Sequence, residues 1–212
     1  MTHPAETWHD ATADAEAVAR VLSTLDPAEW TVYRDLRWPT REFATLDHVV
    51  VGPKGVFVID SLGWSGRVTV AKDEVRLNGL VRDSELVGAV EAAVAIAEML
   101  HSVDAKEVQP VLCFVRDEWL TGTARGVLAC STANLESMLL GRSARLRRER
   151  VRAITGRLDR YDALNSRPVA PRPAADPDES ATTTARRTGP LAVVISLVAM
   201  IAVLICVMIL GF

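Results

Sequence analysis

Residues 46–70, LDHVVVGPKGVFVIDSLGWSGRVTV, decide the fold. Two apolar runs flank the tetrapeptide GPKG at residues 52–55, and glycine and proline in this arrangement are a strong turn signal. We therefore predict a β-hairpin in which Val51 pairs with Val56 across a four-residue loop.

This register brings two carboxylates together. Asp47 comes opposite Asp60, and strand alternation places both side chains on the same face of the sheet. Two acids with Cβ atoms about 5 Å apart repel each other unless a cation, a shared proton or a basic side chain lies between them. Mg²⁺ suits such a pair because it prefers carboxylate oxygens and keeps waters for chemistry. Alternatively, one Asp caps a turn and the other pairs with an arginine.

The rest of the chain reads as a mixed α/β domain, because strand-like and helix-like patterns alternate along it. We expect helices at 13–25, 84–101, 132–140 and 143–164, and strands at 31–36, 46–51, 56–60, 67–71, 74–77, 108–115 and 126–131. The last two strands are nearly all apolar and should be buried on both faces. In the 84–101 helix, Leu86, Val90, Ile96 and Leu100 should face the sheet.

Composition divides the chain into an N-terminal tail (1–12), the α/β domain (13–165), a Pro/Ala/Thr-rich linker (166–189) and a predicted transmembrane helix (190–212). Residues 191–212 carry no charge, and as a helix they span about 33 Å, enough for a hydrocarbon core of roughly 30 Å. Arg186 and Arg187 precede the span, which predicts a single-pass plasma-membrane protein with a cytoplasmic N-terminal domain.

The formal net charge of −3 is too small to imply a strongly charged partner for the whole protein. A local basic segment stands out at 142–160, with arginines that can contact phosphate or anionic lipid, although a solvated helix face is an alternative. The arginines in question are Arg142, Arg145, Arg147, Arg148, Arg150 and Arg152.

Four other residues have simpler interpretations. His48 should lie on the opposite face from Asp47, as a core histidine. Trp64 fits aromatic packing beside a turn better than a stacking platform for bases. Cys113 and Cys130 lie in apolar runs and read as core residues of a reducing compartment, without metal-binding spacing.

Residues 45–70 closely resemble the core of the NERD domain, a nuclease-related domain of many bacterial proteins, and a weaker likeness extends over 14–160. The resemblance implies a restriction-endonuclease-like fold. In that fold an Asp and a later acidic residue bind Mg²⁺, and a Lys two positions further on helps to activate water. Here these positions are Asp47, Asp60 and position 62.

Two positions depart from the family pattern. Leu62 stands where Lys is expected, and Lys54 is about 20 Å away at the turn. Arg67 could come opposite Leu62 and bind phosphate, but a guanidinium is a poor base. The first helix has Asp14-Ala15 where the family has Gly-Glu, with Glu16 as a possible substitute. These departures predict a degenerate site without efficient catalysis.

The sequence therefore predicts a membrane-anchored, nuclease-related domain that binds nucleic acid or a protein partner. One alternative is an active Mg²⁺-dependent nuclease that uses Asp47 and Asp60 as catalytic residues. Another is a non-catalytic scaffold at the inner face of the membrane.

Overall fold

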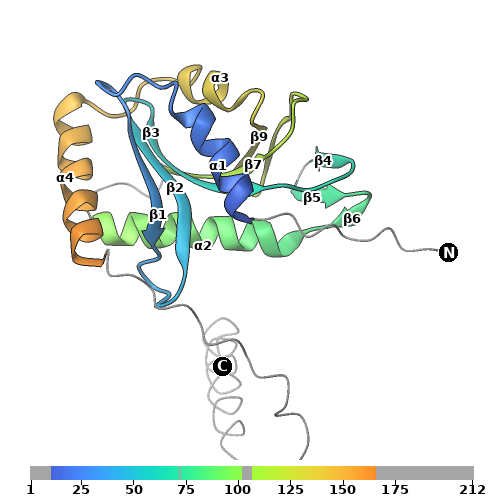
Figure 1. The fold of residues 1–212 in the computed structure, drawn as a ribbon, viewed down its shortest axis with the longest axis horizontal. Coiled ribbons are helices and arrows are strands. Elements are labelled where there is room, and N and C mark those ends of the chain that lie inside the picture. Colours follow the sequence, from blue (N-terminus) through green and yellow to red (C-terminus); the bar gives the residue numbers. More distant parts are fainter. Residues whose placement is uncertain (1–10, 72, 102–106, 166–212) are drawn as a thin grey trace, which may run out of the picture. The chain divides into compact units, whose positions relative to one another are not determined.

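The computed structural model describes residues 11–71, 73–101 and 107–165 (Figure 1). A six-stranded mixed sheet has the order β1-β2-β3-β7-β9-β8, and a three-stranded sheet has the order β4-β5-β6. The elements are α1 (Ala11–Leu22), β1 (Thr31–Arg37), β2 (Thr45–Gly52), β3 (Gly55–Leu62), β4 (Val68–Ala71), β5 (Glu74–Leu77), β6 (Leu80–Val81), α2 (Asp83–Leu100), β7 (Val108–Phe114), β8 (Thr121–Ala124), β9 (Val127–Ser131), α3 (Leu135–Leu140) and α4 (Arg148–Asn165).

The β2–β3 hairpin has the predicted register, because Val51 pairs with Val56. Gly52 and Gly55 also pair, so the loop is two residues long rather than four. A Cβ at Gly52 would lie 2.3 Å from the Trp30 ring, so this turn has room only for glycine. Beyond the hairpin, β3 pairs in parallel with β7, and α2 makes the crossover between them.

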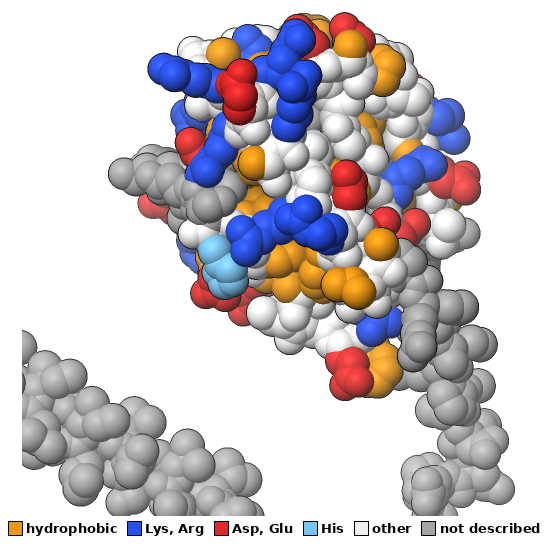
Figure 2. Space-filling view, turned by 90° about the vertical axis from the view of Figure 1, so that its left-hand side faces the viewer, with side chains coloured by type: hydrophobic (Ala, Val, Ile, Leu, Met, Phe, Trp, Pro, Cys, Tyr) orange, Lys and Arg blue, Asp and Glu red, His pale blue; other side chains and the backbone are white. Residues whose placement is uncertain are grey.

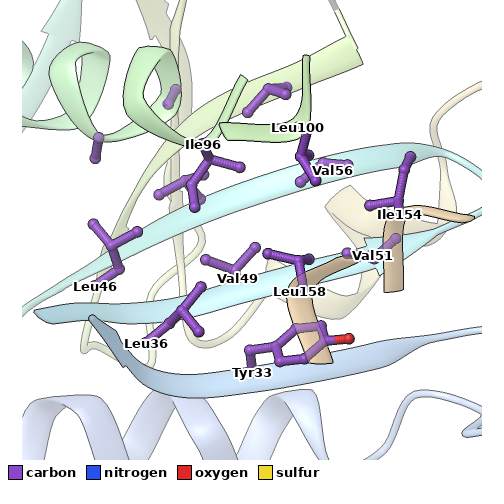
Figure 3. Packing of buried hydrophobic residues seen from close by; sticks show 14 of the residues in the cluster. Tyr33, Leu36, Leu46, Val49, Val51, Val56, Ile96, Leu100, Ile154 and Leu158 are labelled. Carbon is purple, nitrogen blue, oxygen red and sulfur yellow. The ribbon is translucent and has the colours of Figure 1, made fainter. Parts of the chain in front are cut away.

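Helices cover both faces of the large sheet (Figure 1). On one face, Val18 and Leu22 of α1 pack with strand residues such as Phe57 and with α3. On the other face, α2 and α4 pack on β1, β2 and β3 (Figure 3). The residues labelled on that face include Tyr33, Leu36, Leu46, Val49, Val51, Val56, Ile96, Leu100, Ile154 and Leu158.

The small sheet corrects the placement of Arg67. The sequence allowed Arg67 to come opposite Leu62, but among the described residues β3 pairs with β2 and β7, and the chain after Leu62 enters the separate sheet β4-β5-β6. The loop between Gly63 and Gly66 makes this transfer. Arg67 is exposed, and its backbone N–H donates to Asn78 Oδ1 over 2.9 Å.

Helix boundaries and faces differ from expectation in several places: α1 ends at Leu22 rather than at residue 25, and α3 begins at Leu135 rather than at residue 132. Val90 is 37% exposed, so it lies on the outer side of α2 rather than in the stripe that faces the sheet. Residues 142–147 are not helical, and α4 begins at Arg148 instead of residue 143. Strands β6 and β8 were not predicted, because LV is too short and TGTA too polar to show alternation.

The predicted N-terminal tail up to residue 10, the linker and the predicted span at 190–212 lie outside the described residues. Within residues 11–71, 73–101 and 107–165, no helix combines the length and the apolar character needed to cross a membrane. Membrane attachment therefore stays a prediction from the sequence.

Candidate active site

Asp60 lies near the end of β3 on the face covered by α2. It pairs with Leu112 of β7, and Leu112 packs with Leu86 and Ala89 of α2. Burial, together with the charges of Asp47 and Glu85, raises the pKa of Asp60 to about 7. The backbone N–H of the following residue opposes the shift. Near neutral pH this carboxyl therefore exchanges a proton readily.

Asp47 lies at the start of β2, where the hairpin ladder ends. Its Oδ2 accepts a hydrogen bond from the backbone N–H of Ser61 over 2.9 Å. Burial raises the pKa of Asp47, hydrogen bonds from Ser61 lower it, and the charges of Asp35 and Asp14 raise it. The ladder ends at His48 opposite Ile59, and the charge of Asp47 raises the pKa of Asp60, so the two acids lie close enough to affect each other.

The strict alternation that we used to place both acids on one face does not hold through Asp47. Leu46 and Val49 belong to the same hydrophobic cluster although three positions separate them (Figure 3). In β1, which pairs with this part of β2, Asp35 has a left-handed φ of 51°. The irregular backbone interrupts the alternation of side chains between the two faces of the sheet. Asp47 therefore interacts with Asp14 of α1 as well as with Asp60.

Asp14 is an acidic residue of the site that sequence reasoning missed. It is 8% exposed, and a Cβ added to Gly63 would lie 2.2 Å from its Oδ1. The carboxylate of α1 therefore rests against the backbone just beyond β3. Glu16, the suggested substitute, is exposed instead. The available signal was the position of Asp14, which falls where the resembling family has Gly-Glu.

Leu62 supplies no charge to this site. It pairs with Phe114 of β7 and packs against the apolar cluster that contains Phe114 and Leu112. Alternation places it on the same face as Asp60, two positions earlier. Among the described residues, no cation lowers the pKa of Asp47 or Asp60. The side of Asp60 where the family lysine would project is therefore apolar.

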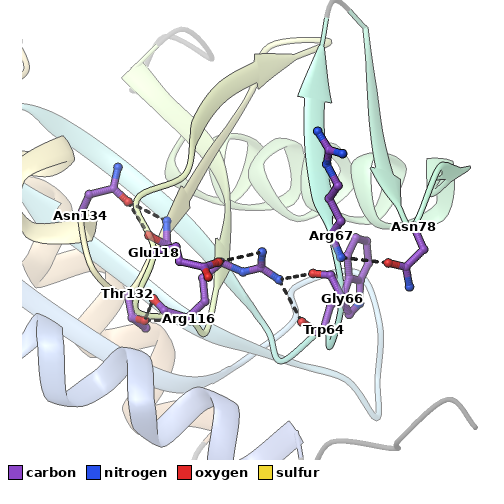
Figure 4. A network of polar contacts seen from close by, with 9 residues as sticks. Trp64, Gly66, Arg67, Asn78, Arg116, Glu118, Thr132 and Asn134 are labelled. Carbon is purple, nitrogen blue, oxygen red and sulfur yellow. Dashed lines mark hydrogen bonds and ion pairs between the residues drawn. The ribbon is translucent and has the colours of Figure 1, made fainter. Parts of the chain in front are cut away.

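Arg116, a half-buried arginine just after β7, is engaged elsewhere (Figure 4). Its guanidinium donates to the carbonyl oxygens of Trp64 over 3.0 Å and of Gly66 over 3.1 Å. Its backbone N–H donates to Thr132 Oγ1, and the Thr132 hydroxyl donates back to the Arg116 carbonyl. Arg116 thus fixes the loop after β3 and does not replace the missing lysine.

His48 and Trp64 have the interpretations that the sequence favoured. His48 is 1% exposed, and burial lowers its pKa to about 4, so it is a neutral core histidine at pH 7. Trp64 packs on Phe114 with ring centroids 5.2 Å apart. Cys113 and Cys130 are buried and free, as expected for core residues.

The basic segment lies away from the acids. The backbone N–H groups of Arg145 and Leu146 donate to the Pro53 carbonyl over 2.8 and 3.0 Å, which holds the segment at the β2–β3 turn. Asp60 is seven residues further along β3, a separation of roughly 20 Å. The structure therefore places Asp47 near Asp60 and, separately, near Asp14, and it leaves the arginines of 142–152 at the other end of the hairpin.

One family model matches this chain, and it covers α1 through the end of β7. A NERD nuclease-related domain is detected at residues 11–115. The NERD match contains Asp14, Asp47, Asp60 and Leu62, and it ends before the arginines at 142–152. No curated protein and no solved structure matches the chain. The mixed sheet with flanking helices agrees with the predicted α/β class.

The acids of the NERD domain fit Mg²⁺ as partial ligands. Asp47 and Asp60 offer the hard carboxylate oxygens that Mg²⁺ prefers, and both have raised pKa values that a nearby cation would lower. In the part of the chain that the structure describes, no three His, Cys, Asp or Glu side chains converge as a metal-binding group. The donor set therefore suits an ion that keeps several waters, not one enclosed by protein ligands.

Proposed function

We propose that the NERD domain of this chain binds the phosphate backbone of nucleic acid through a divalent cation at Asp47 and Asp60, and that it cleaves the backbone poorly. The observation that carries the proposal is Leu62, an apolar side chain on the same face as Asp60 at the position of the family lysine. The domain match supports a nuclease-like or nucleic-acid-related role.

The chemistry follows from the side chains present. Asp47 and Asp60 would hold the ion, which supplies positive charge for a phosphate oxygen and acidifies a bound water. The N–H of Ser61 orients one oxygen of Asp47 and leaves the other for a ligand. Leu62 can neither accept a proton nor stabilise charge. The loss of a general base typically costs about 10² to 10⁴ in rate, which is why we propose binding without efficient hydrolysis.

Attachment to a membrane is the second part of the proposal. Its support is the uncharged run at 191–212, which is long enough to span a bilayer, and the arginines that precede it. The positive-inside bias places the NERD domain on the cytoplasmic side, where nucleic acid is present.

Cleavage and binding assays test the catalytic part. The full chain in a nonionic detergent is incubated with single- and double-stranded DNA and RNA, with Mg²⁺ or Mn²⁺, beside Asp47→Ala. We expect no cleavage above the variant, but metal-dependent nucleic-acid binding that the variant lacks. Cleavage that disappears in Asp47→Ala would instead establish a working nuclease.

A gain-of-function variant tests the role of Leu62 directly. In Leu62→Lys the aliphatic stem can cover the apolar cluster while the ammonium reaches towards Asp60. We expect metal-dependent cleavage to rise by about 10²-fold or more. Leu62→Gln controls for polarity alone, and Leu62→Lys combined with Asp60→Asn should abolish the gain. A folded Leu62→Lys variant without added activity would show that Leu62 is not the limiting defect.

One observation favours the alternative of an active nuclease. A carboxyl with a pKa of about 7, as burial gives Asp60, is suited to proton transfer near neutral pH. Asp14 also adds a negative charge beside Asp47. Such an enzyme would show a rate that rises with pH through about 7 and falls in Asp60→Asn, which distinguishes it from a binding domain.

A further inference from the structure

We propose that the arginine surface, defined as Arg142, Arg147, Arg148, Arg150 and Arg152, docks on anionic lipid headgroups of the membrane to which the chain is attached. The inference rests on the membrane attachment proposed above. It concerns residues outside the NERD match and gives them a partner of their own.

The arginine surface is strongly and locally charged. Residues 142–152 contain six arginines and one acidic residue, Glu149. Arg147, Arg148 and Arg152 are exposed, and Arg142 and Arg150 are half-buried. Within the described part of the chain, no acidic side chain forms an ion pair with any of the five. Figure 2, which faces the α4 side, shows blue side chains gathered in its upper part.

The surface is held rigidly, so its charge is presented at a fixed place. The Pro53 carbonyl accepts two N–H groups from residues 145 and 146. Ile154 and Leu158 of α4 are buried in the core. The Tyr33 hydroxyl donates to Asp159 Oδ1 over 2.7 Å and ties α4 to β1. A preordered cationic surface loses little conformational entropy when it meets a flat anionic one.

The position of the surface favours lipid over nucleic acid. A polyanion bound at Asp60 is roughly 20 Å away, at the other end of the hairpin. On the outer side of α2, the exposed Glu98 repels a nucleic acid path between the two regions, whereas Asp83 and Glu91 are ion-paired with Arg125 and Arg41.

Chain continuity points in the same direction. The apolar run begins at residue 191, only 26 positions after Asn165 at the end of α4. The 25 residues between these two points can span at most about 80 Å. Arg148 lies about 26 Å from Asn165 along α4. The linker is therefore long enough for the arginine surface to meet the membrane that holds the run.

A cavity of about 210 Å³ offers a place for a headgroup phosphate. Arg148 and Arg152 line it together with the hydroxyl-bearing Thr31 and Thr155. Glu29 also lines the cavity and opposes an anion there. Removal of the Glu29 charge should therefore strengthen docking, whereas removal of an arginine should weaken it, so the two substitutions test the proposal in opposite directions.

Energy transfer from tryptophan to dansyl-labelled lipid headgroups measures the docking. The full chain is reconstituted into vesicles of phosphatidylcholine alone or with phosphatidylglycerol. Arg148→Gln with Arg152→Gln is compared with Arg20→Gln plus Arg34→Gln, which removes the same charge from exposed positions elsewhere. We expect stronger transfer with phosphatidylglycerol, loss at high salt, and docking weakened roughly 25-fold in the first variant only. Glu29→Gln should strengthen docking.

Transfer that is independent of lipid charge, or equally reduced in both double variants, would overturn the proposal. So would an unchanged lipid response together with weakened oligonucleotide binding in the Arg148/Arg152 variant, which would assign the surface to nucleic acid. Flotation with neutral vesicles separately tests the membrane attachment. If the chain does not float with them, that attachment fails, and salt-sensitive flotation with anionic vesicles alone then supports or overturns the arginine surface.

Discussion

Asp60→Asn should make the protein more stable, and the gain should grow with pH. The amide keeps the shape of the carboxyl but carries no charge at any pH. In the folded chain the pKa of Asp60 is about 7, against 3.8 for an unperturbed aspartate, because burial and two acidic neighbours disfavour the charged form. At about 1.4 kcal/mol for each unit, ionised Asp60 lowers the free energy of unfolding by about 4 kcal/mol as an upper bound.

The sign follows from the proton count. Below pH 3.8 both the folded and the unfolded chain hold the proton, so Asp60 has no effect on stability through ionisation. Between pH 4 and 7 the unfolded chain has lost the proton and the folded chain retains it, so stability falls as pH rises. Above about pH 7 both are ionised and the difference is constant.

Urea unfolding of the full chain in nonionic detergent, followed by tryptophan fluorescence from about pH 4 to 8, measures this difference. The stability of Asp60→Asn should exceed that of the unmodified chain by about 2 to 4 kcal/mol at the upper end and converge with it at the lower end. Asp117→Asn, at an exposed position, is the matched control. Mg²⁺ should stabilise the unmodified chain at pH 8 but not Asp60→Asn. Parallel pH curves for the two proteins would refute the reasoning.

Three further substitutions test the contacts around the site and helix α4. Gly63→Ala should lower the free energy of unfolding by about 1 to 3 kcal/mol, because its Cβ would meet the Asp14 carboxylate, and Asp14→Ala should remove most of this loss in urea unfolding. Tyr33→Phe should cost about 1 kcal/mol and speed hydrogen exchange in α4, since the hydroxyl bonds to Asp159. Arg157→Gln should speed exchange in the last turn of α2, whose terminal carbonyl accepts from this guanidinium over 2.9 Å, and unchanged exchange would contradict that role.

The sequence predicted the hairpin because its signals are local. A Gly-Pro turn between two apolar runs determines both the register and the buried character of β2 and β3. The same local logic failed one step further on, at Asp47. Alternation is a rule for regular strands, and the left-handed Asp35 on the neighbouring strand breaks it. Aspartate adopts the left-handed region more often than most residues, but one aspartate inside a strand-like run is too weak a signal to predict it.

The errors over Arg67 and Asp14 have a tertiary cause. Residues after Leu62 look like the return strand of a meander, and the sequence does not show that they join another sheet. Asp14 reaches the site because α1 packs on the face of β3, where Gly63 leaves space for its carboxylate. From the sequence alone, a glycine that is needed because another side chain packs against it looks the same as a glycine that is needed for a turn.

The sequence left two explanations for the carboxylate pair: a cation site, or two acids that the fold satisfies separately. The contacts of Asp47 and Asp60 favour the first. Asp47 meets half of the second explanation, because the Ser61 N–H satisfies one of its oxygens. The second explanation also requires an arginine beside Asp60, and the part of the chain that the structure describes does not provide one. No arginine among the described residues offsets its burial, and Glu85 adds further repulsion. If Asp60 had only a structural role, its replacement by a neutral residue would stabilise the protein, since its charge lowers stability and supports no contact. A ligand that binds the charged form, such as the divalent cation with bound phosphate that we propose above, would offset this cost.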